Sequence, residues 1–212
     1  MYIPTKYNEQ DWAQVEYLIR QYPLATVITN SPEQGIVANH FPFYLKEENG
    51  KKVLHAHIAK ANHQRPDLVD GEVLVIFKSE DTYITPSYYA TKADTHKVVP
   101  TWDFAAAHIK GRSKVIDDTQ FVHTQLNNLT NQQEKNRAEP WKVADAPEKY
   151  VAAMQKAIIG LEIEIDSFAC KYKFEQDKPM HDVDGVVAGL AKDDRPQVSA
   201  LVRDTNQRRV AK

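Results

Sequence analysis

The sequence predicts an α+β protein built on an antiparallel barrel to which helices are added. Short β-rich segments follow one another from residue 24 to residue 85, and turn clusters such as Asn49-Gly50 join them as hairpins. The alternation of strand and long helix that is typical of a parallel sheet is missing, and no Rossmann or P-loop glycine motif occurs. Strands joined by hairpins, with few helices between them, favour an antiparallel barrel.

The first half of the chain contains one expected helix and most of the expected strands. Apolar side chains recur at helical spacing in residues 8–20, with Asn8 as the N-cap, and Pro23 ends this helix. Strands are predicted at residues 24–29, 36–45 and 52–59, the last two as an antiparallel hairpin. Residues 72–79 are apolar on both faces, which indicates a central strand, and residues 82–85 continue it or pair beside it.

The second half alternates long strands with helices. Residues 102–116 have β character around Gly111, and Asp117 or Asp118 caps a helix that runs to about residue 136. A short helix from Pro147 is expected to turn Tyr150 and Met154 inward. Strands follow at 159–166 and 168–174, and helices at 184–190 and 196–207.

Charge and composition exclude several classes of protein. The 212 residues carry 27 Lys and Arg against 29 Asp and Glu, so a broad cationic surface for non-specific nucleic-acid binding is excluded. The longest apolar run, residues 73–77, is far too short to cross a bilayer, and the N-terminus lacks the apolar core of a signal peptide. A single cysteine, Cys170, suits a reducing compartment. We therefore expect a soluble cytoplasmic protein.

The densest group of polar residues lies at the end of the hairpin arm 52–59. Lys60, Asn62, His63 and Arg65, with free backbone amides, could hold a phosphate, although a solvated hairpin end has the same composition. His55 and His57 share one face of a strand and could bind a metal, but zinc needs three or four ligands, and the default is a pair of hydrogen-bonded histidines. The residues alone therefore predict no metal.

The other candidate nucleophiles and binding residues lack a supporting motif. Ser87 lacks a nucleophile-elbow motif, and Cys170 lies in an apolar stripe that is typical of a core. A modest cationic patch near the C-terminus could contact DNA, without any helix-turn-helix or zinc-finger motif; it consists of Arg203, Arg208, Arg209 and Lys212.

Eight short motifs in order resemble the PaiB-type family of FMN-binding negative transcriptional regulators, within the FMN-binding split-barrel superfamily. The motifs are MYIP at 1–4, ANHFPF at 38–43, HIAKAN at 57–62, YITPSYY at 83–89, VPTWDF at 99–104, WKVADAP at 141–147, IIGLEI at 158–163 and GVVAGL at 185–190. The resemblance implies a homodimer of six-stranded split barrels, related to pyridoxamine-phosphate-oxidase-like flavoproteins, with FMN at the dimer interface. It also implies a barrel domain at 1–176 and a helical extension at 177–212.

The resemblance assigns roles to particular positions. Lys60 and Asn62 would hold the FMN phosphate, assisted by the amide of Ala61 and by His57. The ring system would be bordered by Asn39, His40 and Phe41. Candidates that could reach the partner subunit's site are Ser87, Tyr88 and Trp102. No catalytic residue is assigned.

The chain departs from the family's usual pattern at several positions. Tyr88 stands where the family usually has Trp, Asp103 where it has Asn, and His63 where Pro is common. The run FEQD at 174–177 replaces Leu-Ser-Gln-Asn, and its added negative charge would oppose FMN if the run lay near the phosphate. The alternative functions are a flavin-dependent oxidoreductase or a heme protein, with His40, His57 or His96 as an axial ligand.

Overall fold

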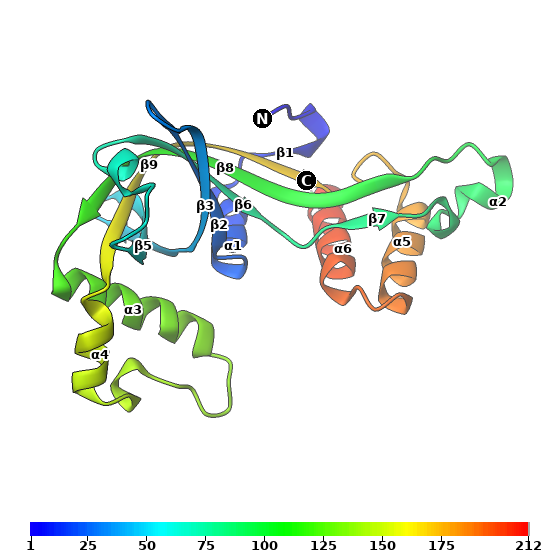
Figure 1. The fold of residues 1–212 in the computed structure, drawn as a ribbon. Helices are drawn as coiled ribbons and strands as arrows, with labels where there is room; N and C mark the ends of the chain where they lie inside the picture. The colour runs from blue at the N-terminus through cyan, green and yellow to red at the C-terminus, as the bar shows by residue number, and fades with distance from the viewer. Residues whose placement is uncertain (212) are drawn as a thin grey trace. The chain divides into compact units, whose positions relative to one another are not determined.

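The computed structural model describes residues 1–211, which divide into two compact units. The sheet unit consists of Ile19–Phe77 and His108–Phe168, and the terminal unit consists of the remaining described residues. Two long strands, β8 (Thr101–Ile116) and β9 (Ile158–Lys173), contribute residues to both units (Figure 1). Each unit is described by itself below.

The sheet unit is organised by antiparallel strands in the order β3-β2-β6-β8-β9-β5-β4. The other strands of this path are β2 (Leu24–Ser31), β3 (Gly35–Pro42), β4 (Tyr44–Glu48), β5 (Lys51–Ala59) and β6 (Glu72–Lys78). β6 lies between β2 and β8, which confirms the central position expected from its apolar sequence. Alternate residues of β2 and β6 are buried, so one face of these strands forms the core of the unit.

The predicted hairpin between β4 and β5 is confirmed. Tyr44 pairs with His55 and Glu48 with Lys51, in antiparallel register. Asn49 and Gly50 both have positive φ, at 52° and 75°, as a two-residue hairpin turn requires. The turn therefore sets which residues of β4 and β5 face each other.

The expected number of six strands is wrong, because the sheet has nine strands among residues 1–211, and its ladders do not close into a barrel. The expected strand 36–45 is interrupted at Phe43, whose N–H donates to Pro23 O at 2.9 Å, so β3 pairs with β2 while β4 pairs with β5. Two short strands add to the count: β1 (Asn8–Glu9) pairs with β9, and β7 (Thr82–Ile84) pairs with β8.

Helices α3 (Thr119–Glu134) and α4 (Glu148–Gln155) belong to the sheet unit, and α3 packs on β4 and β5. Figure 1 shows both on one side of the strands of this unit. Asp118 caps α3 as expected, because its side chain accepts the Phe121 N–H at 2.8 Å. The inward orientation expected for Tyr150 and Met154 is wrong, since both side chains are exposed. Short 3-10 turns lie at Arg65–Leu68 and Val143–Asp145.

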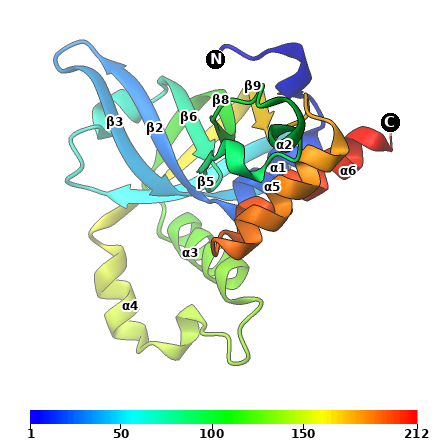
Figure 2. The same ribbon diagram turned by 90° about the vertical axis from the view of Figure 1, so that its right-hand side faces the viewer.

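The terminal unit contains the N-terminal segment and a C-terminal helix pair. Helix α1 (Trp12–Gln21) starts later than expected: Asn8 is in β1, and Asp11 caps the helix by accepting the Ala13 N–H at 3.0 Å. Helices α5 (Met180–Lys192) and α6 (Pro196–Val210) pack against each other (Figure 2). The remaining short elements are η1 (Thr5–Tyr7), η3 (Pro86–Tyr88) and α2 (Thr91–Thr95).

Among residues 1–211, every helix is too short or too polar to span a bilayer.

Candidate functional site

The phosphate site expected at the end of β5 begins where that strand turns. The Lys60 N–H donates to Ala157 O at 2.9 Å, so the backbone is still held by the segment preceding β9. The Asn62 N–H then donates to Ala59 O and the Arg65 N–H to Asn62 O, which folds residues 59–65 into consecutive turns. Lys60 therefore projects from a rigid strand end rather than from a free loop.

The Lys60 ammonium has an acidic partner and a cavity beside it. Its Nζ lies 3.1 Å from Asp117 Oδ1, and the two side chains are 39% and 74% exposed. A cavity of about 270 Å³ adjoins this pair. Its lining residues are Lys60, Asp117, Asp118, Thr119, Val122, Ala152, Gln155, Lys156 and Ile158. An ion pair this exposed contributes about 0–1 kcal/mol, so another anion can replace the Asp117 carboxylate.

Asn39 and Asn62, both expected at the cofactor, are joined through a buried glutamine. Asn39 Nδ2 donates to Gln64 Oε1 at 2.9 Å, and the Gln64 N–H donates to Asn62 Oδ1 at the same distance. Gln64 Nε2 donates in turn to Thr29 Oγ1 at 3.0 Å and to the carbonyls of Val27 and Val37. Gln64 therefore anchors the turn after β5 to β2 and β3.

Three further predicted residues lie on β3 and β5. His57 Nδ1 is 2.8 Å from Gln125 Oε1 on α3, so the imidazole is tied to that helix. His40 is exposed and Phe41 is buried, because successive residues of β3 point to opposite faces. His40 thus faces out of the sheet, and the Phe41 side chain belongs to the core.

Ser87, Tyr88 and Trp102 lie in the terminal unit. Lys92 Nζ donates to Ser87 Oγ at 3.0 Å, and Tyr88 OH donates to Asp193 Oδ2 at 2.5 Å. Burial, and then the bond to Asp193, raise the pKa of Tyr88 to about 12, so the phenol stays protonated. Trp102 Nε1 donates to Asp81 Oδ1 at 2.6 Å, and the indole remains about half exposed.

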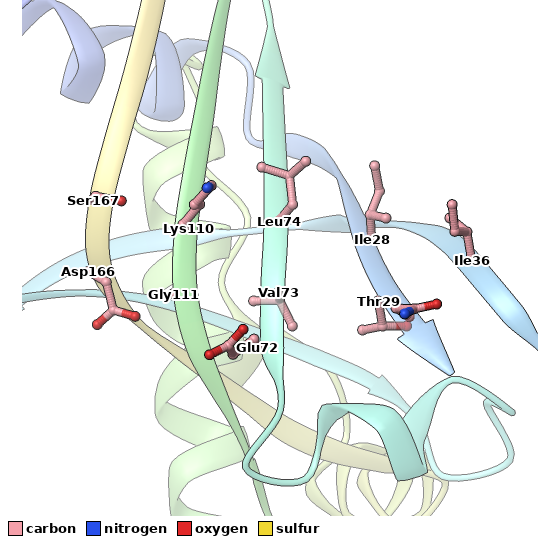
Figure 3. A pocket seen from close by; sticks show the side chains of 11 residues that line it. Ile28, Thr29, Ile36, Glu72, Val73, Leu74, Lys110, Gly111, Asp166 and Ser167 are labelled. Atoms are coloured by element: carbon pink, nitrogen blue, oxygen red, sulfur yellow. The ribbon is translucent and has the colours of Figure 1, made fainter. Parts of the chain in front are cut away.

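A second cavity of the sheet unit, about 620 Å³, contains none of the predicted site residues. It opens on the outer face of β2, β6, β8 and β9, where Ile28 and Leu74 lie side by side and Lys110 and Glu72 stand at the edge (Figure 3). The cavity is larger than the one at Lys60, but its lining has a single cation, Lys110, beside the carboxylates of Glu72 and Asp166. It therefore lacks the convergent cationic donors that a phosphate needs.

Sequence reasoning missed Gln64, Asp117 and Gln125. Gln64 is two residues beyond Asn62 and had no local signal, because a glutamine in a turn is usually exposed. Asp117 was expected only as a helix cap, and Gln125 was not singled out within the helix after it. Their partners on β5 become visible only after α3 is packed against that strand.

Comparison with known families places the chain. Residues 1–167 match the family model described as "Putative FMN-binding domain". The chain belongs to this family of FMN-binding domains, and the PaiB-type resemblance drawn from its motifs is confirmed. Family membership makes FMN the cofactor to test against the site.

Two curated relatives align along nearly the whole chain. An uncharacterized protein of Emericella nidulans is 33% identical, with 98% of both chains covered. The protease synthase and sporulation protein PAI 2 of Bacillus subtilis is 25% identical, with 99% of this chain and 100% of the relative covered.

Solved structures show the same fold at low identity. The FAD and heme binding protein from Mycobacterium smegmatis superposes with a TM-score of 0.58 at 18% identity, covering 84% of this chain and 79% of its own. The flavocytochrome Anf3 from Azotobacter vinelandii gives 0.56 at 16% identity, covering 79% and 69%. These superpositions show that the chain shares its α+β fold, which contains a large antiparallel sheet, with both structures.

The residues around Lys60 fit the phosphate end of FMN. Two ammonium groups, Lys60 and Lys156, and the Thr119 hydroxyl line the cavity. Of the two carboxylates there, Asp118 is engaged in capping α3 and Asp117 is held only by the exposed pair with Lys60. A dianionic phosphate can therefore displace Asp117 from Lys60 at low cost.

Proposed function

We propose that the chain binds FMN with its phosphate at Lys60, as a homodimer that controls transcription in response to that cofactor. The observation that carries the proposal is the cavity at the end of β5, where two lysines meet the first turn of α3. The family match over residues 1–167 supports FMN as the ligand of this cavity.

Different site residues would contact the phosphate and the ring system of FMN. Lys60, the amide of Ala61 and the Asn62 side chain would hold the phosphate, with His57 positioned behind them by Gln125. The ring system would be bordered by Asn39, His40 and Phe41, and a second copy would contribute Ser87, Tyr88 and Trp102. When bound, FMN supplies a ring that accepts and returns a hydride, and the protein provides its binding and orientation.

A second copy of the chain would complete the site. The cavity at Lys60, about 270 Å³, is smaller than the roughly 300–1,000 Å³ of pockets that enclose whole ligands of drug size. Most of FMN therefore needs another surface. The outer face of β2 and β3 offers one, because Leu24 and Ile36 are 62% and 79% exposed.

The test of FMN binding is a titration of the flavin-free full chain, followed by quenching of flavin fluorescence. Lys60→Ala should weaken FMN binding by about 10-fold or more, because one charge-assisted bond to the phosphate is lost. Lys114→Ala, at an exposed position of β8 outside the cavity, is the matched control and should bind like the native chain. Equal affinity of the Lys60→Ala variant and the native chain contradicts the proposed phosphate site.

The dimer is tested separately by light scattering on a sizing column. Ile36→Asp places a charge on the outer sheet face and should give monomers, whereas Val69→Asp, at an exposed position preceding β6, should leave the dimer intact. A native chain that is monomeric with FMN bound contradicts the homodimer and leaves FMN binding standing.

The regulatory role needs its own measurement, because few cations of the C-terminal helix are free. Arg203 lies 3.1 Å from Asp204, and Arg209 donates to the backbone carbonyls of Gln176 and Lys178. Lys212, also expected in this patch, lies outside the described residues. Residues 177–212 would form the helical extension that transmits cofactor binding to DNA or to a protein partner.

Direct DNA binding predicts a steep loss of affinity with salt in a gel-shift titration. DNA binding that does not depend on salt, or the absence of DNA binding, favours a protein partner. Bleaching of bound FMN by NADH or NADPH without air would favour the alternative, a flavin-dependent oxidoreductase. A Soret band after addition of hemin would favour the heme alternative.

A further inference from the structure

A second cluster of polar residues lies in the sheet unit, on the other side of the first turn of α3. His55 on β5 stands directly opposite Glu162 on β9, and Glu48 reaches the pair from β4. His55 Nε2 is 3.0 Å from Glu162 Oε2. One potential ligand atom from each of the three residues lies within 4.8 Å of the other two.

The imidazole of this cluster is fixed, while its carboxylates retain freedom. The His55 side chain is 7% exposed, and its ring lies 4.8 Å from the Phe121 ring at the start of α3. Glu162 is partly exposed, and Glu48 is exposed at the end of β4, next to the turn of the β4–β5 hairpin. A fixed imidazole nitrogen beside two carboxylates whose side chains can change rotamer is an arrangement that can bind a ligand.

The cluster opens into a cavity whose charge is unbalanced. The cavity of about 300 Å³ is lined by Lys46, Glu48, His55, Ile116, Asp118, Gln120, Phe121, Thr124 and Glu162. With His55 neutral, the three carboxylates and the one ammonium sum to −2. A divalent cation neutralises this charge.

We propose that His55, Glu162 and Glu48 bind a divalent transition-metal ion of the zinc, manganese, iron or cobalt class. One imidazole and two carboxylates suit these ions better than Mg²⁺ or Ca²⁺, which prefer oxygen ligands alone. Three protein ligands leave coordination positions open to the cavity, where Asp118, Gln120 and Thr124 can contact bound water.

The geometry requires one small movement. Ligand atoms about 2.1 Å from a metal ion lie roughly 3.4 Å from one another in a tetrahedral site. The 3.0 Å spacing of His55 Nε2 and Glu162 Oε2 is close to this value. Glu48 Oε1 lies 3.0 Å from Lys46 Nζ, and this exposed ion pair would break when the Glu48 carboxylate binds the ion.

This site differs from the His55–His57 pair considered from the sequence. His57 is tied to Gln125 and does not join the cluster, whereas both glutamates come from strands other than β5. The proposal also stands apart from FMN binding, because Lys60 does not line this cavity.

The test uses the flavin-free full chain, from which metal is removed by dialysis against EDTA. The protein is then titrated with Co²⁺, and binding is followed by the visible d–d absorption of the ion. One equivalent of Co²⁺ should bind per chain, and equimolar Zn²⁺ should displace it. Glu162→Gln and Glu48→Gln should each lower the Co²⁺ affinity by about 10–100-fold or more, since even outer-shell partners of a metal have effects of this size.

Two controls separate metal ligation from general charge and from misfolding. Glu47→Gln removes the same charge from the neighbouring position of β4, which is outside the cluster, and should bind Co²⁺ like the native chain. Glu48 is exposed, so Glu48→Gln should keep the native circular dichroism spectrum. Failure of the native chain to bind Co²⁺ at millimolar concentration, or equal affinity in the Glu48→Gln and Glu47→Gln variants, overturns the proposal.

Discussion

Each unit contains a cluster in which acidic side chains meet a buried titratable group, and the two clusters are built differently. In the terminal unit, Asp103 is fully buried and Glu175 is 2% exposed. Tyr89 OH donates to Glu175 Oε2 at 2.9 Å, and Lys173 Nζ lies 3.6 Å from Asp103 Oδ1. In the sheet unit, the pair of His55 and Glu162 lies at the wall of a cavity.

Burial keeps one member of each cluster neutral. It raises the pKa of Asp103 to about 9, helped by repulsion from Glu175, so the Asp103 carboxyl is protonated at neutral pH. It lowers the pKa of His55, against the opposing attraction of Glu162. The physical cause is the same in both clusters, because a low-polarity environment disfavours whichever form is charged.

The difference between the clusters is access to solvent. Because Asp103 is fully buried and Glu175 is 2% exposed, we expect the electrostatics of the Asp103 cluster to act mainly on folding stability. The residues of the His55 cluster line a cavity, so an ion from solvent can bind to their carboxylates. Closed clusters of this kind are therefore expected to control stability, and open ones to control binding.

The largest effect should come from removing the cation of the closed cluster. Lys173→Met leaves two buried carboxyls without a nearby positive charge and removes the donor to Thr101 Oγ1 and Trp102 O. Because Lys173 is 18% exposed, we expect a loss of about 3 kcal/mol, the lower end of the range for broken buried pairs. Urea unfolding measures it, with Lys110→Met, at an exposed position of β8, as the control. Equal losses in the two variants would contradict the assignment.

A smaller loss should follow from Tyr89→Phe, which removes the hydroxyl that donates to Glu175. A hydrogen bond to a charged acceptor contributes about 1.5–3 kcal/mol, and we expect a loss in this range. The measurement is the urea midpoint at pH 7. An unchanged midpoint would mean that Glu175 finds another donor.

Asp103→Asn should stabilise the protein and change its pH dependence. The pKa of Asp103 is about 9 in the folded chain and about 3.9 in an unfolded chain, so the native state binds more protons between these values and stability falls as pH rises. Asparagine cannot ionise, so we expect the Asp103→Asn variant to be more stable than the native chain at pH 8, with a difference that shrinks toward zero at pH 4. Thermal unfolding from pH 4 to pH 9 measures it. Parallel curves for both proteins would contradict a raised pKa.

The smallest effect on stability is expected in the open cluster. Glu162→Gln keeps the shape of the side chain and changes a partly exposed pair, so the free energy of unfolding should change by less than about 1 kcal/mol. The same variant should bind Co²⁺ more weakly than the native chain. A loss as large as that of Lys173→Met would show that the cluster stabilises the fold and would remove the contrast between the units.

Local signals in the sequence determined much of the secondary structure. Asn49-Gly50 predicts its hairpin because both residues tolerate positive φ, and Asp118 predicts the start of α3 because its side chain satisfies an unpaired backbone N–H. The family, and FMN with it, followed from short motifs that survive in order along the chain. These features depend on neighbours in sequence.

The tertiary structure alone decided the number of strands and the partners of the site residues. A break at Phe43 and two short strands at the ends of β8 and β9 change the sheet without a strong local signal. His55 meets Glu162 across 107 positions of the chain, and Lys60 meets Asp117 only after α3 is packed on β5. Strand register and helix packing set these contacts. Both depend on the free energy of the whole folded chain rather than on that of a short window of residues.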